Sequence, residues 1–249
     1  MQIRLSGLAL CTASLFLVGC GKKGPLLYPD LLIAQSPNQV QVEQADTALR
    51  ITFVLPEKDQ AGRPLTDLEA VRVARKVCTQ SDCRGCLEPY QELQRIDLAF
   101  PAPAERAGSR FSWTDNGVRQ GEVAQYQLVS EQKGNVKGGA VQSLPARLTA
   151  AVPPPVCTGK AVFGGMIQLS CSSTDSSTGR LQGYLVYRAE GQGPMLFITH
   201  LESGKVYADQ SVSRGVVYRY AFKQQIRRED GIIQESAFSV PLSLSLEEE

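Results

Sequence analysis

The fold of this 249-residue chain is decided by a set of residues that occurs twice: Trp113-Thr114-Asp115 with Gly121 and Tyr126, and Tyr207-Ala208-Asp209 with Gly215 and Tyr220. In both sets an aromatic residue stands two positions before the aspartate, and the glycine and the tyrosine follow at the same spacings. Self-similarity of this kind is the sequence signature of a repeated structural unit. We therefore expect two domains of the same fold, with Tyr126 buried in one and Tyr220 in the other.

The residues around each set alternate between apolar and polar, as half-buried strands do. Segments 49–55 and 217–223 show this period of two, with β-branched and aromatic residues among the apolar positions. Turn sequences interrupt the alternation about every ten residues, as at Asp115-Asn116-Gly117, Lys133-Gly134-Asn135 and Glu229-Asp230-Gly231. No sustained period of 3.6 residues accompanies them, so the predicted fold class is all-β, with two tandem β-sandwiches.

The repeat resembles fibronectin type III domains, which are immunoglobulin-like sandwiches. In that family an aromatic-x-Asp sequence ends one strand, a glycine opens the next turn, and Tyr-x-Tyr begins the following strand. The second copy matches at Tyr207-Ala208-Asp209, at Gly215 and at Tyr218-Arg219-Tyr220. Gly183–Arg188 also looks like the third strand of the family. The copy departs at Cys171, which occupies the position of a buried tryptophan.

The first copy matches the same family at Asp115, Gly121 and Tyr126. Phe53-Val54-Leu55-Pro56 resembles the Trp-x-x-Pro sequence of the family's second strand. The copy departs at Ala124, where the family has a tyrosine whose hydroxyl closes the corner between two strands. This departure puts the corner hydrogen bond of the first domain in question.

Three consecutive prolines between Val152 and Val156 form a stiff, extended joint, and we place the domain boundary there. The predicted division is a signal peptide at 1–19, a lipidated tether at 20–35, a first domain at 36–151, a second at 152–245, and an acidic tail at 246–249.

The N-terminus has the features of an export signal. Arg4 precedes a mostly apolar stretch, Leu5–Gly19, which is shorter than the ~20 residues that a membrane-spanning helix needs. Leu17-Val18-Gly19-Cys20 resembles the bacterial lipobox, which implies cleavage before Cys20 and lipidation of its thiol. Gly21 is not the aspartate that retains lipoproteins at an inner membrane. We therefore expect a lipid anchor in an outer membrane, with the body facing the periplasm.

The segment after the lipobox resembles the start of the small lipoproteins that assist assembly of the lipopolysaccharide-export β-barrel. The matching residues are Cys20, Gly21, Lys23, Gly24, Pro25, Leu26 and Pro29. Leu27 departs, because the family has an aromatic residue there. The resemblance implies that this segment docks on an outer-membrane β-barrel assembly protein. A tether rich in glycine and proline that binds no partner is the alternative.

Composition argues against several functions. Lys and Arg number 26 against 25 Asp and Glu, so no basic excess attracts nucleic acid. The chain has a single histidine, which argues against most histidine-based catalysis and histidine-rich metal sites. We interpret this residue, His200, as a surface residue at a strand end. No enzyme activity, small-molecule substrate, metal or cofactor is predicted.

Export permits disulfides, and Cys157 and Cys171 should lie on the first two, antiparallel strands of the second domain. Cys171 shares the inward-facing parity of Ile167 and Leu169. A bridge between the two cysteines would close a loop of about 15 residues and contribute roughly 3 kcal/mol. It would also compensate for the missing tryptophan. Two buried thiols are the alternative.

Cys78, Cys83 and Cys86 are expected in a loop between strands. A zinc site would need a fourth ligand, and a redox pair would need a helix start to lower the thiol pKa. A structural staple needs only two of the three and is the preferred interpretation, with Cys78 joined to Cys83 or to Cys86.

These observations lead to one main hypothesis and two rivals. The main hypothesis is a non-catalytic outer-membrane lipoprotein that binds another protein in the periplasm and serves envelope assembly. The rivals are a carbohydrate- or cell-wall-binding lipoprotein, which would need exposed aromatic residues, and a redox lipoprotein that uses Cys78, Cys83 and Cys86.

Overall fold

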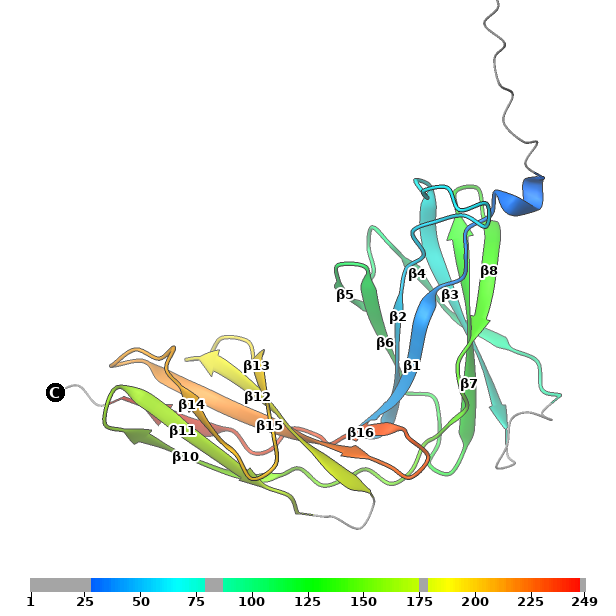
Figure 1. The fold of residues 1–249 in the computed structure, drawn as a ribbon. Coiled ribbons are helices and arrows are strands. Elements are labelled where there is room, and N and C mark those ends of the chain that lie inside the picture. The colour runs from blue at the N-terminus through cyan, green and yellow to red at the C-terminus, as the bar shows by residue number, and fades with distance from the viewer. Residues whose placement is uncertain (1–27, 79–86, 175–178, 247–249) are drawn as a thin grey trace, which may run out of the picture.

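The computed structural model describes residues 28–78, 87–174 and 179–246. These residues form two β-sandwiches that meet at an angle (Figure 1), and the predicted all-β class is confirmed. The helical content of the described residues is one 3-10 turn, η1 (Pro29–Leu31). No helix within these ranges has the length and apolarity required to cross a membrane.

The strands of the first sandwich are β1 (Asn38–Ala45), β2 (Ala48–Val54), β3 (Leu68–Cys78), β4 (Gln91–Asp97), β5 (Glu105–Ala107), β6 (Arg110–Asp115), β7 (Val123–Gln132), β8 (Val136–Gln142) and β9 (Ala146–Arg147). Those of the second are β10 (Val156–Val162), β11 (Met166–Ser172), β12 (Arg180–Glu190), β13 (Leu196–Leu201), β14 (Val206–Asp209), β15 (Val217–Arg227), β16 (Ile233–Glu235) and β17 (Leu242–Ser245).

Both sandwiches divide their strands between two sheets in the same way. In the first, β1-β2-β6-β5 faces β4-β3-β7-β8, and β9 pairs with β7. In the second, β10-β11-β14 faces β13-β12-β15, with β16 and β17 both paired to β15. The strand that ends in the repeated aspartate, β6 or β14, therefore lies in one sheet, and the strand with the repeated tyrosine, β7 or β15, in the other.

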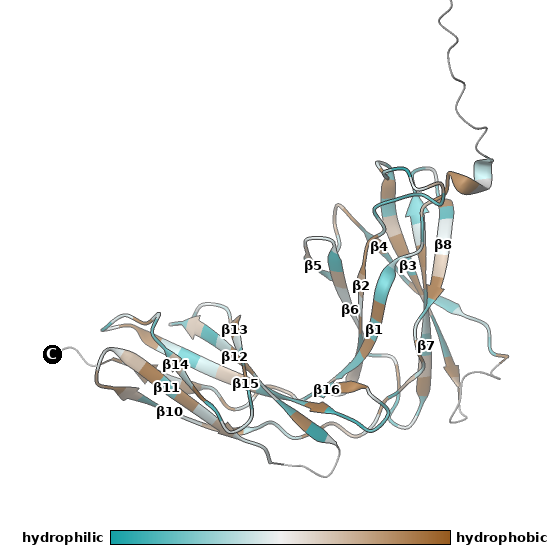
Figure 2. Ribbon diagram, viewed as in Figure 1, coloured by the Kyte–Doolittle hydropathy of each residue, from teal (hydrophilic) through white to brown (hydrophobic). Residues whose placement is uncertain are grey.

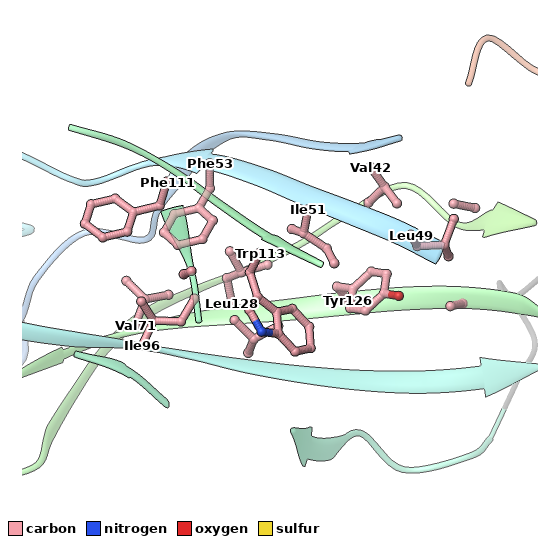
Figure 3. Packing of buried hydrophobic residues seen from close by; sticks show 14 of the residues in the cluster. Val42, Leu49, Ile51, Phe53, Val71, Ile96, Phe111, Trp113, Tyr126 and Leu128 are labelled. Carbon is pink, nitrogen blue, oxygen red and sulfur yellow. The ribbon is translucent and has the colours of Figure 1, made fainter. Parts of the chain in front are cut away.

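The core of the first sandwich lies between its two sheets, and hydrophobic and hydrophilic bands succeed one another along its strands (Figure 2). Leu49, Ile51 and Phe53 alternate along β2 and all face this core (Figure 3). Phe53 stacks on Phe111 with ring centroids 5.7 Å apart. Each large apolar side chain buried in this way contributes roughly 2 kcal/mol.

The second core repeats this arrangement with Ile167 and Leu169 from β11 and Tyr220 and Phe222 from β15. The motif tyrosines Tyr126 and Tyr220 are both fully buried, which confirms the prediction for these two residues. Alternation along the chain thus identified the inward-facing positions of both repeats.

The two sandwiches share one nine-stranded sheet. β16 of the second pairs in parallel with β1 of the first, with Gln44 opposite Gln234 and Ala45 opposite Glu235. The sheet therefore runs β13-β12-β15-β16-β1-β2-β6-β5 across the junction, and its ninth strand, β17, pairs with β15 off this path.

Buried glutamines hold the residues that connect β9 to β10. The side-chain amides of Gln44, Gln224 and Gln234 donate to the carbonyls of Thr149, Pro153 and Ala150, at 2.9, 2.7 and 2.7 Å. All three glutamines are fully buried. The connection is thus bonded to strands of both sandwiches, and the angle between them is defined by specific contacts.

The chain packs on the first sandwich before β1 begins. Ala34 is fully buried, its N–H donates to Gln132 Oε1 at 2.7 Å, and its carbonyl accepts from Gly139 N–H at 2.7 Å. A Cβ on Gly139 would lie 2.5 Å from the backbone nitrogen of Ser36, so this close approach requires glycine. Residues 31–35, assigned from sequence to the tether, are therefore attached to the sandwich.

Candidate binding surface

Most of the predicted docking segment lies outside the described residues, namely Cys20, Gly21, Lys23, Gly24, Pro25 and Leu26. Pro29 is described and is exposed at the start of η1, next to Tyr28, which is 74% exposed. η1 lies at the end of the first sandwich that faces away from the second (Figure 1). Lipidation at Cys20 and docking through residues 20–29 stay predictions.

The predicted bridge between Cys157 and Cys171 is present and joins directly opposite residues of β10 and β11. Both cysteines pack against the second core. Cys78 is also disulfide-bonded. Cys83 and Cys86 lie outside the described residues, so the choice between them stays a prediction.

The expected loop position of Cys78 is wrong. Cys78 is the last residue of β3 and is only 2% exposed, in a small apolar cluster with Val123. The strand continues to this residue, because β3 pairs with β7 along its whole length and ends with Cys78 opposite Val123.

A cluster centred on the repeated aspartate occurs in both sandwiches. In the first, Tyr126 Oη donates to Asp115 Oδ2 at 2.9 Å, and Arg75 Nη1 donates to the same oxygen at 2.7 Å. In the second, Tyr220 Oη and Arg188 Nη1 donate to Asp209 Oδ2 at 2.9 and 2.8 Å. The equal spacing of the two sequence sets thus reflects one repeated hydrogen-bonded cluster.

The pKa shifts in these clusters indicate a structural role rather than a catalytic one. Burial raises the pKa of Tyr126, and the negative charge of Asp115 raises it further. Burial and then the hydrogen bond to Asp209 raise the pKa of Tyr220 in the same way. Both phenols therefore stay protonated as donors, and both carboxylates are buried and already paired. Neither cluster presents a free nucleophile or base.

The tyrosine corner is present in one sandwich only. The backbone N–H of Ser213 donates to Tyr218 Oη at 2.9 Å in the second sandwich. Ala124, which takes the equivalent place in the first, is fully buried and has no hydroxyl. Alanine at position 124 therefore removes the corner hydrogen bond from the first sandwich.

Two further repeated residue types escaped the sequence analysis. Arg75 and Arg188 each end a Val-x-Arg sequence on the third strand of their sandwich. Ser143 and Ser239 each begin a Ser-x-Pro sequence, and their hydroxyls accept from the N–H groups of Tyr126 and Phe222 at 3.0 and 3.1 Å. The two arginines, and likewise the two serines, are not separated by the 94 residues that separate the two aspartates. The loops between the strands differ in length, so a search at a single spacing misses these residues.

No protein-family model matches the chain, and no curated protein matches it. Among solved structures, the chain is similar to the FN1–FN3 domains of chicken CNTN1, with 10% identity over 86% of this chain and 69% of that chain, at a TM-score of 0.42. It is also similar to a two-domain fibronectin type III segment from chicken tenascin, with 14% identity over 85% of this chain and 100% of that chain, at a TM-score of 0.31.

The strand order, the repeated aspartate cluster and the tyrosine corner agree with the family resemblance seen in the sequence. The fold is fibronectin type III-like.

The solvent-facing side of the nine-stranded sheet lines the inside of the angle between the sandwiches (Figure 1), and we call it the inner face. Phe197 of β13, Tyr187 of β12 and Phe238, which follows β16, form an aromatic row across it. The ring centroid of Tyr187 lies 5.6 Å from that of Phe197 and 4.9 Å from that of Phe238, and both pairs meet edge to face. Phe197 is 55% exposed and Phe238 is 43% exposed.

Charged groups flank the aromatic row on the side of the junction. Lys223 Nζ lies 4.5 Å from the ring centroid of Phe238, within the range of a cation–π interaction. Arg50 of β2 donates to both carboxylate oxygens of Glu235, at 3.0 and 2.6 Å, and to Glu43 at 2.8 Å. This forked pair joins the first sandwich to the second on the inner face.

The pKa values of the junction follow from burial and from Arg50. Burial alone would raise the pKa of Glu235, but the hydrogen bonds and the charge of Arg50 outweigh it and lower this pKa below its ordinary value. Burial, and then the charge of Glu235, raise the pKa of Tyr187. The inner face therefore presents aromatic side chains, a neutral phenol and an ion pair that is already formed. These groups can make packing contacts with a partner.

Proposed function

We propose that the chain is a non-catalytic, lipid-anchored binding protein of the outer membrane, which serves envelope assembly in the periplasm. The observation that carries the binding role is the aromatic row on the inner face. Exposed aromatic residues gathered on one surface typically mark interaction sites, because they supply contact area at a small cost in conformational entropy.

The packing of the N-terminal segment supports the anchored role. Residues 31–35 are bonded to the first sandwich, so a tether that ends at a lipid on Cys20 would attach the membrane to the outer end of that sandwich. The second sandwich and the inner face would then extend away from the membrane. The two or three acyl chains implied by the lipobox resemblance suffice for lasting attachment without help from the protein surface.

Processing provides the direct test of the anchor. The mature protein should begin at Cys20 and carry acyl mass, and Cys20→Ser should yield a soluble or unprocessed chain. Intact-mass measurement of the membrane fraction decides the matter. A chain that keeps Met1 and carries no lipid would refute the anchored role.

The envelope-assembly role is tested at the segment that resembles the small assembly lipoproteins. Changing Lys23, Pro25 and Leu26 together should abolish recovery of a barrel-assembly protein after crosslinking, while lipidation and folding persist. The matched control is Leu31→Ala, a partly exposed position outside the resemblance. Equal recovery by the triple variant would reduce residues 21–30 to a tether.

A glycan-binding role is the second candidate, and the same aromatic row favours it. Sugar rings stack on exposed aromatic side chains, and Phe197 and Phe238 of this row are 55% and 43% exposed. Soluble peptidoglycan fragments should perturb the resonances of Tyr187, Phe197 and Phe238 if this candidate holds. If Phe197→Ala and Phe238→Ala bind the fragments as well as the unaltered chain does, this surface is not a glycan-binding site.

A further inference from the structure

We propose that β13 is a pairing edge through which two copies of this chain associate, strand to strand, into a symmetric dimer. The argument begins with the two ends of the nine-stranded sheet. One end is β5, which has three residues, all exposed, two of them the charged Glu105 and Arg106. Short, charged edge strands resist further pairing.

The strand at the other end of the sheet, β13, is longer and uncharged, and its one irregularity against β12 is a register shift beside Phe197. β13 has the sequence Leu-Phe-Ile-Thr-His-Leu over six residues, with no Asp, Glu, Lys or Arg. Its first two residues, Leu196 and Phe197, are 63% and 55% exposed. Within the described ranges, β12 is the one strand that pairs with β13. An apolar edge strand of this length presents backbone donors and acceptors to a further strand.

The first sandwich supplies an internal comparison. β4 holds the same place there, next to the third strand of its sandwich, and it contains Glu92, Arg95 and Asp97. Arg95 is bonded to Glu131 of β7, and Glu92 is bonded to Arg72 of β3. The repeat therefore carries charges at this edge in one sandwich and lacks them in the other.

The chemistry of the edge identifies its occupant. Another extended backbone can pair with the free N–H and C=O groups along the edge of a strand. Two β13 strands can meet antiparallel about a two-fold axis, and no like charges then face each other. The aromatic rows of the two copies would become continuous, because Phe197 ends the row at this edge.

The dimer should be weak. A six-residue strand pair buries much less than the ~800 Å² per partner of a standard interface. Association should therefore appear only at high protein concentration in solution. Confinement of both copies to a membrane would raise their effective concentration. The inference itself does not depend on a lipid, so it can fail while the proposed function stands.

The test is sedimentation velocity over a concentration series. The protein used is the chain with Cys20→Ser, so that neither lipid nor detergent contributes. The paired change Leu196→Lys and Phe197→Lys should weaken dimerisation by about tenfold or more, because the edge then carries two charges and loses the apolar contacts of Leu196 and Phe197. The control is Phe163→Lys, the same change at a fully exposed phenylalanine in the turn between β10 and β11, which should leave dimerisation unaltered.

Hydrogen exchange supplies a second measurement that does not depend on the variants. Amides of β13 should become protected as the concentration rises, whereas those of β4 should not change. A chain that stays monomeric at every concentration would overturn the inference and would leave β13 to a strand from another protein. Dimerisation that persists in the double lysine variant, or protection that appears elsewhere, would overturn it as well.

Discussion

At the scale of single residues, Asp209 is the centre of the second sandwich's polar cluster. Asp209→Asn removes the negative charge that accepts from Arg188 and Tyr220, and leaves a largely buried guanidinium without its carboxylate. We expect the free energy of unfolding to fall by about 3 kcal/mol, measured by urea denaturation. The control is Asp230→Asn, an exposed partner of Arg228, where the loss should be under about 1 kcal/mol. Equal losses in the two variants would contradict the structural role of the cluster.

At the scale of elements, the bridge between Cys157 and Cys171 joins β10 to β11. Replacing both cysteines by serine should destabilise the second sandwich by roughly 3 kcal/mol, because the unfolded chain regains the freedom of the closed loop. Hydrogen exchange should then show faster opening of β10 and β11, and unchanged protection of β3 and β7 in the first sandwich. Loss of protection in both sandwiches alike would mean that they unfold as one unit.

At the scale of the whole molecule, the angle between the sandwiches depends on the pair Arg50 and Glu235. Since the pKa of Glu235 is lower in the folded protein than its ordinary value of 4.5, the pair stabilises the junction fully above that value. The stabilisation is lost as the pH falls through the lowered pKa. Small-angle scattering should therefore show a wider distribution of shapes in acid, and Glu235→Gln should produce the same effect at neutral pH.

A matched control separates the junction from general loss of a buried charge. Glu131→Gln changes another fully buried glutamate that is bonded to two arginines, Arg72 and Arg95, but within the first sandwich. It should lower stability without changing the distribution of shapes. Scattering curves that are identical for Glu235→Gln and the unaltered chain would show that the β1–β16 pairing and the buried glutamines maintain the angle without this ion pair.

Local pattern predicted the cores and failed for the candidate surface. Leu49, Ile51 and Phe53 could be placed inside because an alternating strand has only two faces and the apolar one is buried. The same reasoning assigned most aromatic residues to the core. It missed the aromatic row, because Phe197, Tyr187 and Phe238 lie on the solvent side of the sheet. Phe197 lies at a register shift opposite Tyr187, and Phe238 lies where the last strand is interrupted between β16 and β17. Such irregularities leave no periodic signal.

The sequence by itself determined the all-β class, the repeat, the burial of Tyr126 and Tyr220, and the bridge between Cys157 and Cys171. Each follows from spacing within a few strands, where alternation and parity dictate which side chains meet. Only the tertiary structure decided that β16 pairs with β1, that Arg50 binds Glu235, and that an aromatic row and an uncharged edge share one face. These contacts join residues far apart in the chain, and many partners satisfy the same local pattern, so that three-dimensional packing alone selects among them.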